Sequence, residues 1–246
     1  MQEIPPFRFK QFSVRQQQSA MKVGFDGVLL GAWANVTECK RILDVGSGTG
    51  LIAMMLAQRT ASQSLTTIDA VEIDEGAYAE SLENVADSPW GDRILCHHQR
   101  IQEFGAANAP PFDHVVCNPP FFAAGVRVRT NDEETPRITA RHSTRLTLAE
   151  LFEISSRIVS DTGRLSLILP IDRAESAMTV AAENRLHCSR RTDVKRNSSA
   201  DAKRVLMEFQ RTAASMESNS ITIETETRHV YSEEFIALTR EFYLKM

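Results

Sequence analysis

The sequence lacks a long hydrophobic run. The longest apolar stretch in a predicted helix, Leu51 to Ala57, is far shorter than the roughly 20 residues that a bilayer-spanning helix needs. The beginning of the chain contains Pro5 and Pro6 and no apolar segment typical of a secretory signal. We therefore expect a cytoplasmic protein with no membrane partner.

Cysteine pairs are also missing. The four cysteines form no Cys-x-x-Cys motif, which predicts reduced thiols in a cytosolic protein rather than disulfides. His97 and His98 are adjacent on a predicted strand, and adjacent strand residues point to opposite faces of a sheet. Neither pattern is typical of a metal site, so we expect no metal.

The chain has no large excess of charge. Its net charge is −4, which excludes a protein that is basic throughout. Basic residues are nevertheless concentrated locally, with seven of them against two acidic residues between Arg185 and Arg204. Such a segment can bind phosphates or can be an ordinary solvated surface, and charge alone leaves both interpretations open.

What is present is a regular alternation of strand and helix patterns. The 246 residues show no internal repeat, and their composition is that of one large soluble domain. Strands are predicted near residues 41–45, 66–73, 93–98, 112–117, 163–169, 187–195 and 203–211, with an uncertain further one near 220–225. This order predicts an α/β fold: a doubly wound, mostly parallel, seven-stranded Rossmann-like sheet over residues 41–246, preceded by a short extension at 1–40.

A glycine-rich turn follows the first of these strands, from Asp44 to Gly50. Its glycines are spaced Gly46-x-Gly48-x-Gly50, and Leu51 occupies the place of the third glycine in a dinucleotide motif. Glycines allow close approach of a ligand, and a helix start offers free N–H groups to a carboxylate or phosphate. The turn, including Ser47, therefore predicts a site for a nucleoside cofactor.

Two carboxylates fit the same cofactor. Asp44 can hold an ammonium group, directly or through water. Glu72, with Ile73 beside it, ends the second strand and can accept hydrogen bonds from ribose hydroxyls. After the third strand, Gln99 can bind an adenine edge through its amide, and Arg100 can stack on it.

The segment Asn118-Pro119-Pro120-Phe121 follows the fourth strand. The Asn118 side-chain oxygen and the Pro119 carbonyl can each accept one N–H of a planar amine, and these bonds strengthen as positive charge develops on nitrogen. The prolines restrict the backbone, and Phe121 can stack on a target base. Because the first and fourth strands are expected to be neighbours, both motifs should face one crevice. Together they predict methyl transfer from S-adenosylmethionine to a nitrogen.

These motifs are similar to motifs I and IV of the class I, Rossmann-like amino-group methyltransferases. Over nearly its whole length the chain resembles, in particular, the bacterial tRNA1(Val) (adenine-37-N6)-methyltransferases. The resemblance is carried by segments 9–12, 21–33, 56–60, 191–194 and 242–246, of which Met21 to Trp33 is the most specific. Two residues depart from the pattern: Arg100 replaces an acidic residue, and Phe121 replaces a tyrosine.

The resemblance implies methylation of the adenine next to the valine anticodon of a tRNA. It also implies that Lys22 and Asp26, in the extension, close over the cofactor or the target base. We expect RNA backbone along the long loop after Asn118 and along the basic segment; the candidate contacts are Arg127, Arg129, Arg137, Arg141, Arg145, Arg190, Arg191, Lys195 and Arg196. We expect a monomer.

Other functions remain open on the residues alone. A protein glutamine N5-methyltransferase acting on release factors uses the same amide-holding geometry, but usually carries a larger domain ahead of the glycine turn. A DNA adenine methyltransferase normally needs a separate recognition domain. A non-catalytic protein that binds S-adenosylmethionine or RNA is the alternative from another class, and the intact Asn118 motif counts against it.

Overall fold

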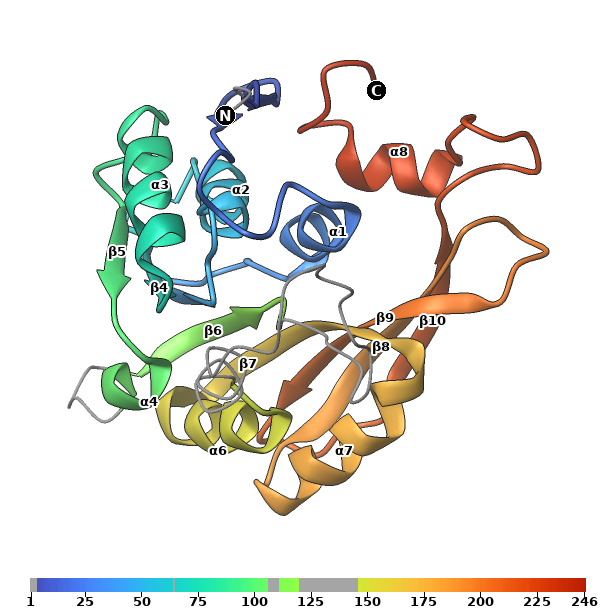
Figure 1. The fold of residues 1–246 in the computed structure, drawn as a ribbon. Coiled ribbons are helices and arrows are strands. Elements are labelled where there is room, and N and C mark those ends of the chain that lie inside the picture. Colours follow the sequence, from blue (N-terminus) through green and yellow to red (C-terminus); the bar gives the residue numbers. More distant parts are fainter. Residues whose placement is uncertain (1–3, 64, 106–110, 120–145) are drawn as a thin grey trace, which may run out of the picture.

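The computed structural model describes residues 4–63, 65–105, 111–119 and 146–246. Its main strands in chain order are β3 (Arg41–Val45), β4 (Thr67–Glu72), β5 (Ile94–His98), β6 (Phe112–Cys117), β7 (Val159–Pro170), β8 (His187–Lys195), β9 (Ala202–Gln210) and β10 (Glu217–Thr222). They form one sheet in the spatial order β10-β8-β9-β7-β6-β3-β4-β5 (Figure 1). All neighbouring pairs run parallel except those that β9 makes with β7 and β8.

The doubly wound, mostly parallel α/β fold that the sequence predicts is confirmed. The sheet has eight strands in the described residues, one more than the expected seven. The additional strand is β10 at the sheet edge, where only Ile221 is buried and residues 217–220 are exposed and mostly polar. Because it buries one side chain, β10 lacks the apolar alternation by which strands are recognised in a sequence.

Helices cover both faces of the sheet. They are α1 (Phe25–Trp33), α2 (Leu51–Arg59), α3 (Glu75–Ala86), α4 (Ile101–Phe104), α6 (Leu148–Ile158), α7 (Ala174–Glu183) and α8 (Glu233–Thr239), with a 3-10 turn η1 (Ile171–Arg173). Figure 1 shows α1, α2, α3 and α8 on one side of the sheet and α4, α6 and α7 on the other. Each side has its own apolar core, one built around α1 and α2 and the other around α6 and α7.

Local sequence explains where several helices begin. Asp74 accepts a hydrogen bond from the Ala77 N–H at 2.9 Å and thereby caps α3. Thr147 and Glu150 form a reciprocal capping box at the start of α6. These caps set the points at which the chain leaves the strands and turns across the sheet.

The helix of the N-terminal extension packs closely on α2. A Cβ added at Gly31 would lie 2.8 Å from Sδ of Met55, and one at Gly27 would lie 3.1 Å from Leu51. Gly27 and Gly31 are four residues apart and share one helix face, so the two glycines bring the helices together. This contact places the beginning of α1 next to the glycine turn that precedes α2.

The two ends of the described chain also meet. Strands β1 (Phe7–Arg8) and β2 (Ser13–Val14) form a small antiparallel pair, and Phe9 makes an isolated bridge with Tyr243. Phe9 and Phe12 are buried in the same core as α2. The extension and the C-terminal tail therefore form one layer over the α1 side of the sheet (Figure 1).

Candidate functional site

The two sequence motifs lie at the ends of neighbouring strands. Strands β3 and β6 pair in parallel, with Val45 opposite Cys117. The glycine turn and Asn118 therefore leave the sheet side by side at its carboxyl edge, where open α/β sheets bind their ligands. Both line one cavity of about 450 Å³. The prediction that the two motifs face a common crevice is confirmed.

The three glycines of the turn serve two purposes. Gly46, Gly48 and Gly50 all have positive φ, at 69°, 55° and 79°, a region that other residues rarely adopt. A Cβ at Gly46 or Gly48 would meet no atom within 4 Å, so these two glycines face open space. Gly50 instead caps α2 and packs against Ser81 and Val85. Ser47, between the first two glycines, is buried, and its hydroxyl has no partner among the described residues.

Asp44 is a fully buried carboxylate directly beneath the turn. Its Oδ2 accepts the Ala53 N–H at 3.1 Å, which satisfies a free donor in the first turn of α2. Its Oδ1 is buried and has no partner among the described residues. Burial, followed by the nearby charge of Glu72, raises the pKa of Asp44 to about 7. An unpaired buried oxygen of this kind can receive a cationic ligand group.

Glu72 is held rigidly at the end of β4. Its Oε2 accepts the Gly48 N–H at 2.8 Å, and its Oε1 accepts the N–H groups of Ile73 and Asp74, each at 2.8 Å. These bonds link the end of β4 to the glycine turn after β3. The carboxylate lines the cavity in a fixed orientation, with lone pairs left for a ligand hydroxyl.

The cavity collects several residues predicted from sequence and some that the sequence did not indicate. Among the candidates, Gly46, Gly48, Glu72, Ile73, Gln99 and Asn118 line it, as does Arg100. The additional lining includes Ser19, Ala20, Met21, Ile101 and Leu146. Ser19 and Ala20 lie in a loop before α1 whose sequence carries no periodic or motif signal, whereas Met21 begins the segment 21–33 that carries the family resemblance. Ile101 and Leu146 are single apolar residues at or near helix starts.

The loop of residues 15–22 is fastened to α3, and Glu80 makes the central contact. The buried Glu80 carboxylate accepts the N–H groups of Gln17, Gln18 (3.1 Å) and Ser19 (2.9 Å). Asn84, one turn further along α3, binds both the N–H and the carbonyl of Arg15. The helix therefore holds the segment that forms one wall of the cavity.

Lys22 and Asp26 do not line the cavity, and neither do the candidates Asp44, Ser47 and Gly50. The Lys22 ammonium group donates to the carbonyls of Gln16 at 2.5 Å and Ser19 at 2.8 Å. It thereby fixes the curvature of the loop. Asp26 pairs with Arg204 of β9 at 2.8 Å and joins the start of α1 to the sheet.

Asn118 lies close to α1 as well as to the glycine turn. A Cβ added at Gly27 would be 4.0 Å from the Asn118 Nδ2. Pro119 is buried behind it. Phe121 lies outside the described residues, as do the candidate RNA contacts Arg127, Arg129, Arg137, Arg141 and Arg145.

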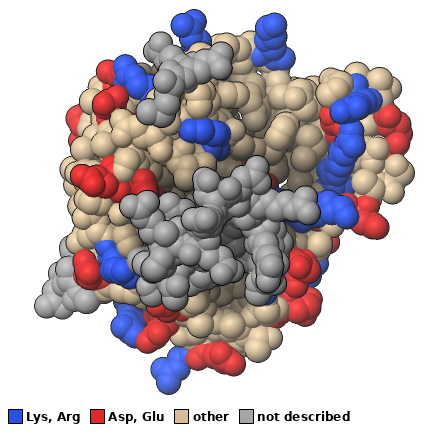
Figure 2. All heavy atoms as spheres, viewed as in Figure 1, with Lys and Arg blue, Asp and Glu red and all other residues tan. Residues whose placement is uncertain are grey.

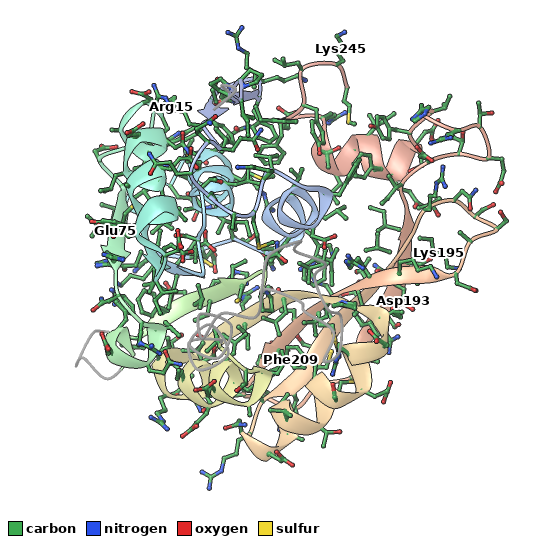
Figure 3. All side chains as sticks on the ribbon, in the orientation of Figure 1. Arg15, Glu75, Asp193, Lys195, Phe209 and Lys245 are labelled. Carbon is green, nitrogen blue, oxygen red and sulfur yellow. The ribbon has the colours of Figure 1, made fainter. Side chains whose placement is uncertain are left out.

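Three of the remaining RNA candidates lie on β8, and Arg196 follows its last residue. This strand is near the opposite edge of the sheet from β5. Figure 3 shows the labelled Asp193 and Lys195 on this strand, far from Glu75 of α3. The Arg190 guanidinium stacks 3.6 Å above the Trp33 ring and donates to Glu208 at 3.3 Å. Arg191 pairs with the carboxylate of Asp193, and Arg196 pairs with that of Glu224.

No helix in the described part of the chain is long and apolar enough to cross a membrane.

Comparisons with known proteins agree with this geometry. The model of the methyltransferase small domain matches residues 27–169. A tRNA1(Val) (adenine(37)-N6)-methyltransferase of Flavobacterium psychrophilum is 46% identical over 98% of this chain and 100% of its own length. A protein with the same name from Trichodesmium erythraeum is 42% identical over 97% of this chain and 98% of its own.

A similar fold occurs in a solved structure. The crystal structure of a predicted O-methyltransferase from Agrobacterium tumefaciens superposes with a TM-score of 0.67 at 18% identity, over 88% of this chain and 96% of that one. At this identity the likeness concerns the fold, whereas the family assignment rests on the domain match and the full-length relatives. The chain therefore belongs to the methyltransferase small-domain family and, within it, to the tRNA1(Val) (adenine(37)-N6)-methyltransferases.

Proposed function

We propose that this protein methylates N6 of the adenine at position 37 of tRNA1(Val), with S-adenosylmethionine as the methyl donor. The observation that carries the proposal is the position of Asn118 beside the open glycine turn, in one cavity of about 450 Å³. An amide that can hold an amine thus faces a turn that can hold a nucleoside. The names of the full-length relatives support the same reaction and the same RNA.

The residues around the turn fit S-adenosylmethionine. Gly46 and Gly48 border open space, so the ligand can approach the backbone there. The unpartnered Oδ1 of Asp44 suits the ammonium group of a methionine moiety, and the Glu72 carboxylate suits ribose hydroxyls. Gln99 lies where an adenine edge can reach its amide. When bound, the cofactor supplies a methyl group on a positively charged sulfur.

Asn118 prepares the amine. The lone pair of an aromatic amine is delocalised into its ring, which makes the nitrogen a poor nucleophile. By accepting one N–H each, the Asn118 amide oxygen and the Pro119 carbonyl orient the nitrogen and favour its more tetrahedral form. Their bonds strengthen as positive charge develops on nitrogen, so they stabilise the transition state more than the ground state. The fixed ends of β3 and β6 provide the alignment that direct transfer requires.

The extension completes the site in this proposal. Ser19, Ala20 and Met21 form one wall of the cavity, and Glu80 and Lys22 hold that wall in place. Asp26 and Gly27 bring the start of α1 towards Asn118. Residues 4–40 thus act as a cover over the cofactor, and the protein works as a monomer in the cytoplasm.

We assign the RNA backbone to the basic residues beyond the cavity. Lys195 and the arginines of β8 provide cations towards one edge of the sheet. The arginines between Asn118 and Leu146, which lie outside the described residues, are further candidates for the same RNA. Contacts of this kind position the tRNA without reading its sequence. The target adenine leaves the stack of the anticodon loop to reach Asn118.

Methyl transfer with labelled S-adenosylmethionine tests the function. The purified protein is incubated with bulk tRNA, with DNA and with a release factor in parallel. We expect label in tRNA alone, and mass spectrometry of nuclease fragments should place N6-methyladenine at position 37 of tRNA1(Val). Label in the release factor would replace the proposal by glutamine methylation, and no label in any substrate would contradict an enzymatic role.

A further inference from the structure

A second cavity, of about 510 Å³, lies next to the candidate active site and is not explained by methyl transfer. We call it the terminal pocket, because the first and last described segments of the chain form its walls. Its lining comprises Phe7, Arg8, Val23, Gly24, Phe25, Tyr231, Tyr243, Leu244, Lys245 and Met246. Residues of segments 21–33 and 242–246, two of the segments that carry the family resemblance, therefore meet in a cavity outside the cofactor site.

Aromatic rings dominate the walls of the terminal pocket. Phe25 is 46% exposed, although it begins a helix and packs on the buried Phe235 with ring centroids 5.9 Å apart. Tyr231 packs on Phe235 from another direction, at 5.2 Å. Tyr243 rests on the buried Phe9 at 5.8 Å. An inner row of buried phenylalanines thus holds an outer row of aromatic side chains that face the cavity, which makes a rigid platform for stacking.

The charges around the terminal pocket are positive. Arg8 and Lys245 line it, and no Asp or Glu is among its described lining residues. Lys10 donates to the Arg240 carbonyl at 2.5 Å and to an oxygen of Met246 at 3.2 Å, which fastens the tail that carries Lys245. Figure 3 shows Lys245 on this tail, and the upper part of the face in Figure 2 is mainly uncharged, with basic groups along its top and both basic and acidic groups at its left and right. Exposed rings between cations suit a base and its phosphates.

The terminal pocket is adjacent to the site of methyl transfer. Met21 lines the cofactor cavity and Val23 lines the terminal pocket. Two residues of extended chain span at most about 7 Å, so the two walls are neighbours. An RNA loop that delivers one adenine to Asn118 can place an adjoining nucleotide over this region.

We propose that the terminal pocket binds an unpaired nucleobase of the substrate RNA, stacked on Phe25 and Tyr231, with Arg8 and Lys245 on the neighbouring phosphates. The inference rests on the proposed function, because the RNA is the one whose adenine is methylated. It adds a second base-binding subsite, which selects a single-stranded loop over a duplex. A helical RNA keeps its bases stacked internally and cannot fill this pocket.

The test measures RNA binding separately from methyl transfer. A fluorescent RNA hairpin with an unpaired, adenine-containing loop is titrated with wild-type protein and with Phe25→Ala, Phe25→Leu and Phe25→Trp. Stacking of one base predicts about tenfold weaker hairpin binding by the alanine and leucine variants, and near wild-type binding by the tryptophan variant. A blunt duplex of the same stem should bind all four proteins equally. Leu95→Ala, which truncates another exposed apolar side chain, is the matched control.

A charge reversal tests the phosphate contact. Lys245→Glu should weaken hairpin binding and reduce the slope of log affinity against log salt by about 0.7, the value for one phosphate contact on a single strand. Lys40→Glu, the reversal of an exposed lysine at the amino end of β3, should leave both quantities unchanged. Affinity for S-adenosylmethionine should be wild-type in all variants, which shows that the cofactor cavity is intact.

Two results separate failure of this inference from failure of the function. If wild type methylates tRNA and Phe25→Ala binds the hairpin as tightly as wild type, the terminal pocket does not hold a base. If wild type transfers no methyl group to tRNA, the proposed function fails, whereas the hairpin titrations still decide whether the pocket binds RNA. Loss of duplex binding along with hairpin binding would also overturn the assignment, because it would indicate a contact that does not depend on unpaired bases.

Discussion

The cofactor cavity and strand β8 both contain residues that the sequence marks as functional, yet they use their polar groups differently. At the glycine turn, Oδ1 of the buried Asp44 has no partner among the described residues, and Gly46 and Gly48 border open space. On β8, Arg190 stacks on Trp33 and pairs with Glu208, and Arg191 pairs with Asp193. The turn leaves groups available to a ligand, whereas the charges on β8 are paired within the protein, although the buried Nε of Arg190 also has no partner among the described residues.

The difference follows from position in the sheet. Residues at the carboxyl ends of parallel strands leave the ladder, so their polar groups can face a ligand. Residues within a strand have neighbours on both sides, and charged side chains there are stabilised by partners on adjacent strands and helices. A basic run in a sequence therefore says less about binding than a polar residue directly after a strand. Four experiments test this contrast.

The largest effect is expected for Asn118→Ala. Loss of the amide acceptor should lower kcat by about 10²- to 10³-fold, because the bond strengthens in the transition state. Affinity for S-adenosylmethionine should change little, since the glycine turn, Asp44 and Glu72 remain. Methyl-transfer kinetics and calorimetric titration measure the two quantities. An equal loss of turnover and cofactor affinity would show that Asn118 binds the cofactor rather than the amine.

The second effect concerns pH. With a pKa of about 7, Asp44 is mostly protonated at pH 5 in the free protein, and a ligand ammonium beside Oδ1 favours the carboxylate. Binding should then release a proton, and affinity should rise about tenfold per pH unit up to pH 7 and level off above it. Calorimetry in buffers of different ionisation enthalpy measures the proton release. Asp44→Asn should abolish it, and a wild-type affinity independent of pH would refute the contact.

The same carboxylate affects the stability of the free protein. Its folded pKa of about 7 lies above the usual aspartate value of 3.8, so the unfolded chain loses this proton first as pH rises. Stability should therefore decrease between about pH 4 and pH 7 and show no further contribution from Asp44 above that window. This loss provides an independent check on the pKa, because it needs no ligand.

A third, smaller effect is expected for Arg190→Ala. The change removes a stacked cation and leaves the Glu208 carboxylate, which is only 9% exposed, without that partner. We expect a loss of about 2 kcal/mol, or a decrease in Tm of about 4–8 °C for a chain of this size. Thermal unfolding measures it. An unchanged Tm with weaker RNA binding would instead assign Arg190 to the RNA interface.

Lys195→Ala should give the smallest effect. In contrast to Arg190→Ala, we expect it to change RNA binding and to leave stability unchanged. Its side chain is a candidate phosphate contact on the same strand, so its loss should weaken tRNA binding a few-fold with no change in Tm. The slope of log affinity against log salt should fall by about one unit or less. If tRNA affinity and its salt dependence both stay at wild-type values, β8 contributes no backbone contact at this position.

Much of the fold was predictable because its signals are local. Short apolar runs, the glycine turn and the Asp74 cap each depend on a few adjacent residues, and the structure confirms the strands and helices they indicate. β10 was harder to recognise, since one buried residue in a polar edge strand gives no periodic pattern. The convergence of the glycine turn and Asn118 was predictable too, because the order of parallel strands follows from their connections.

The roles of individual charged residues were harder to predict from the sequence. Lys22 donates hydrogen bonds to the carbonyls of Gln16 and Ser19. Glu80 accepts hydrogen bonds from three backbone N–H groups of the same loop. Both contacts join residues whose spacing shows no motif, and the second spans about sixty positions of sequence. Whether a charge binds a ligand or its own backbone depends on such contacts.

The amino-acid sequence alone determined the α/β fold and the chemistry at two strand ends, because strand and turn signals arise from neighbouring residues. The tertiary structure alone decided which polar groups stay available, how the 15–22 loop lines the cavity, and that the two terminal segments enclose an aromatic pocket. Whether a polar group can bind a ligand depends on its desolvation and on hydrogen-bond partners that are distant in the chain. Those quantities exist only once the helices and strands have packed.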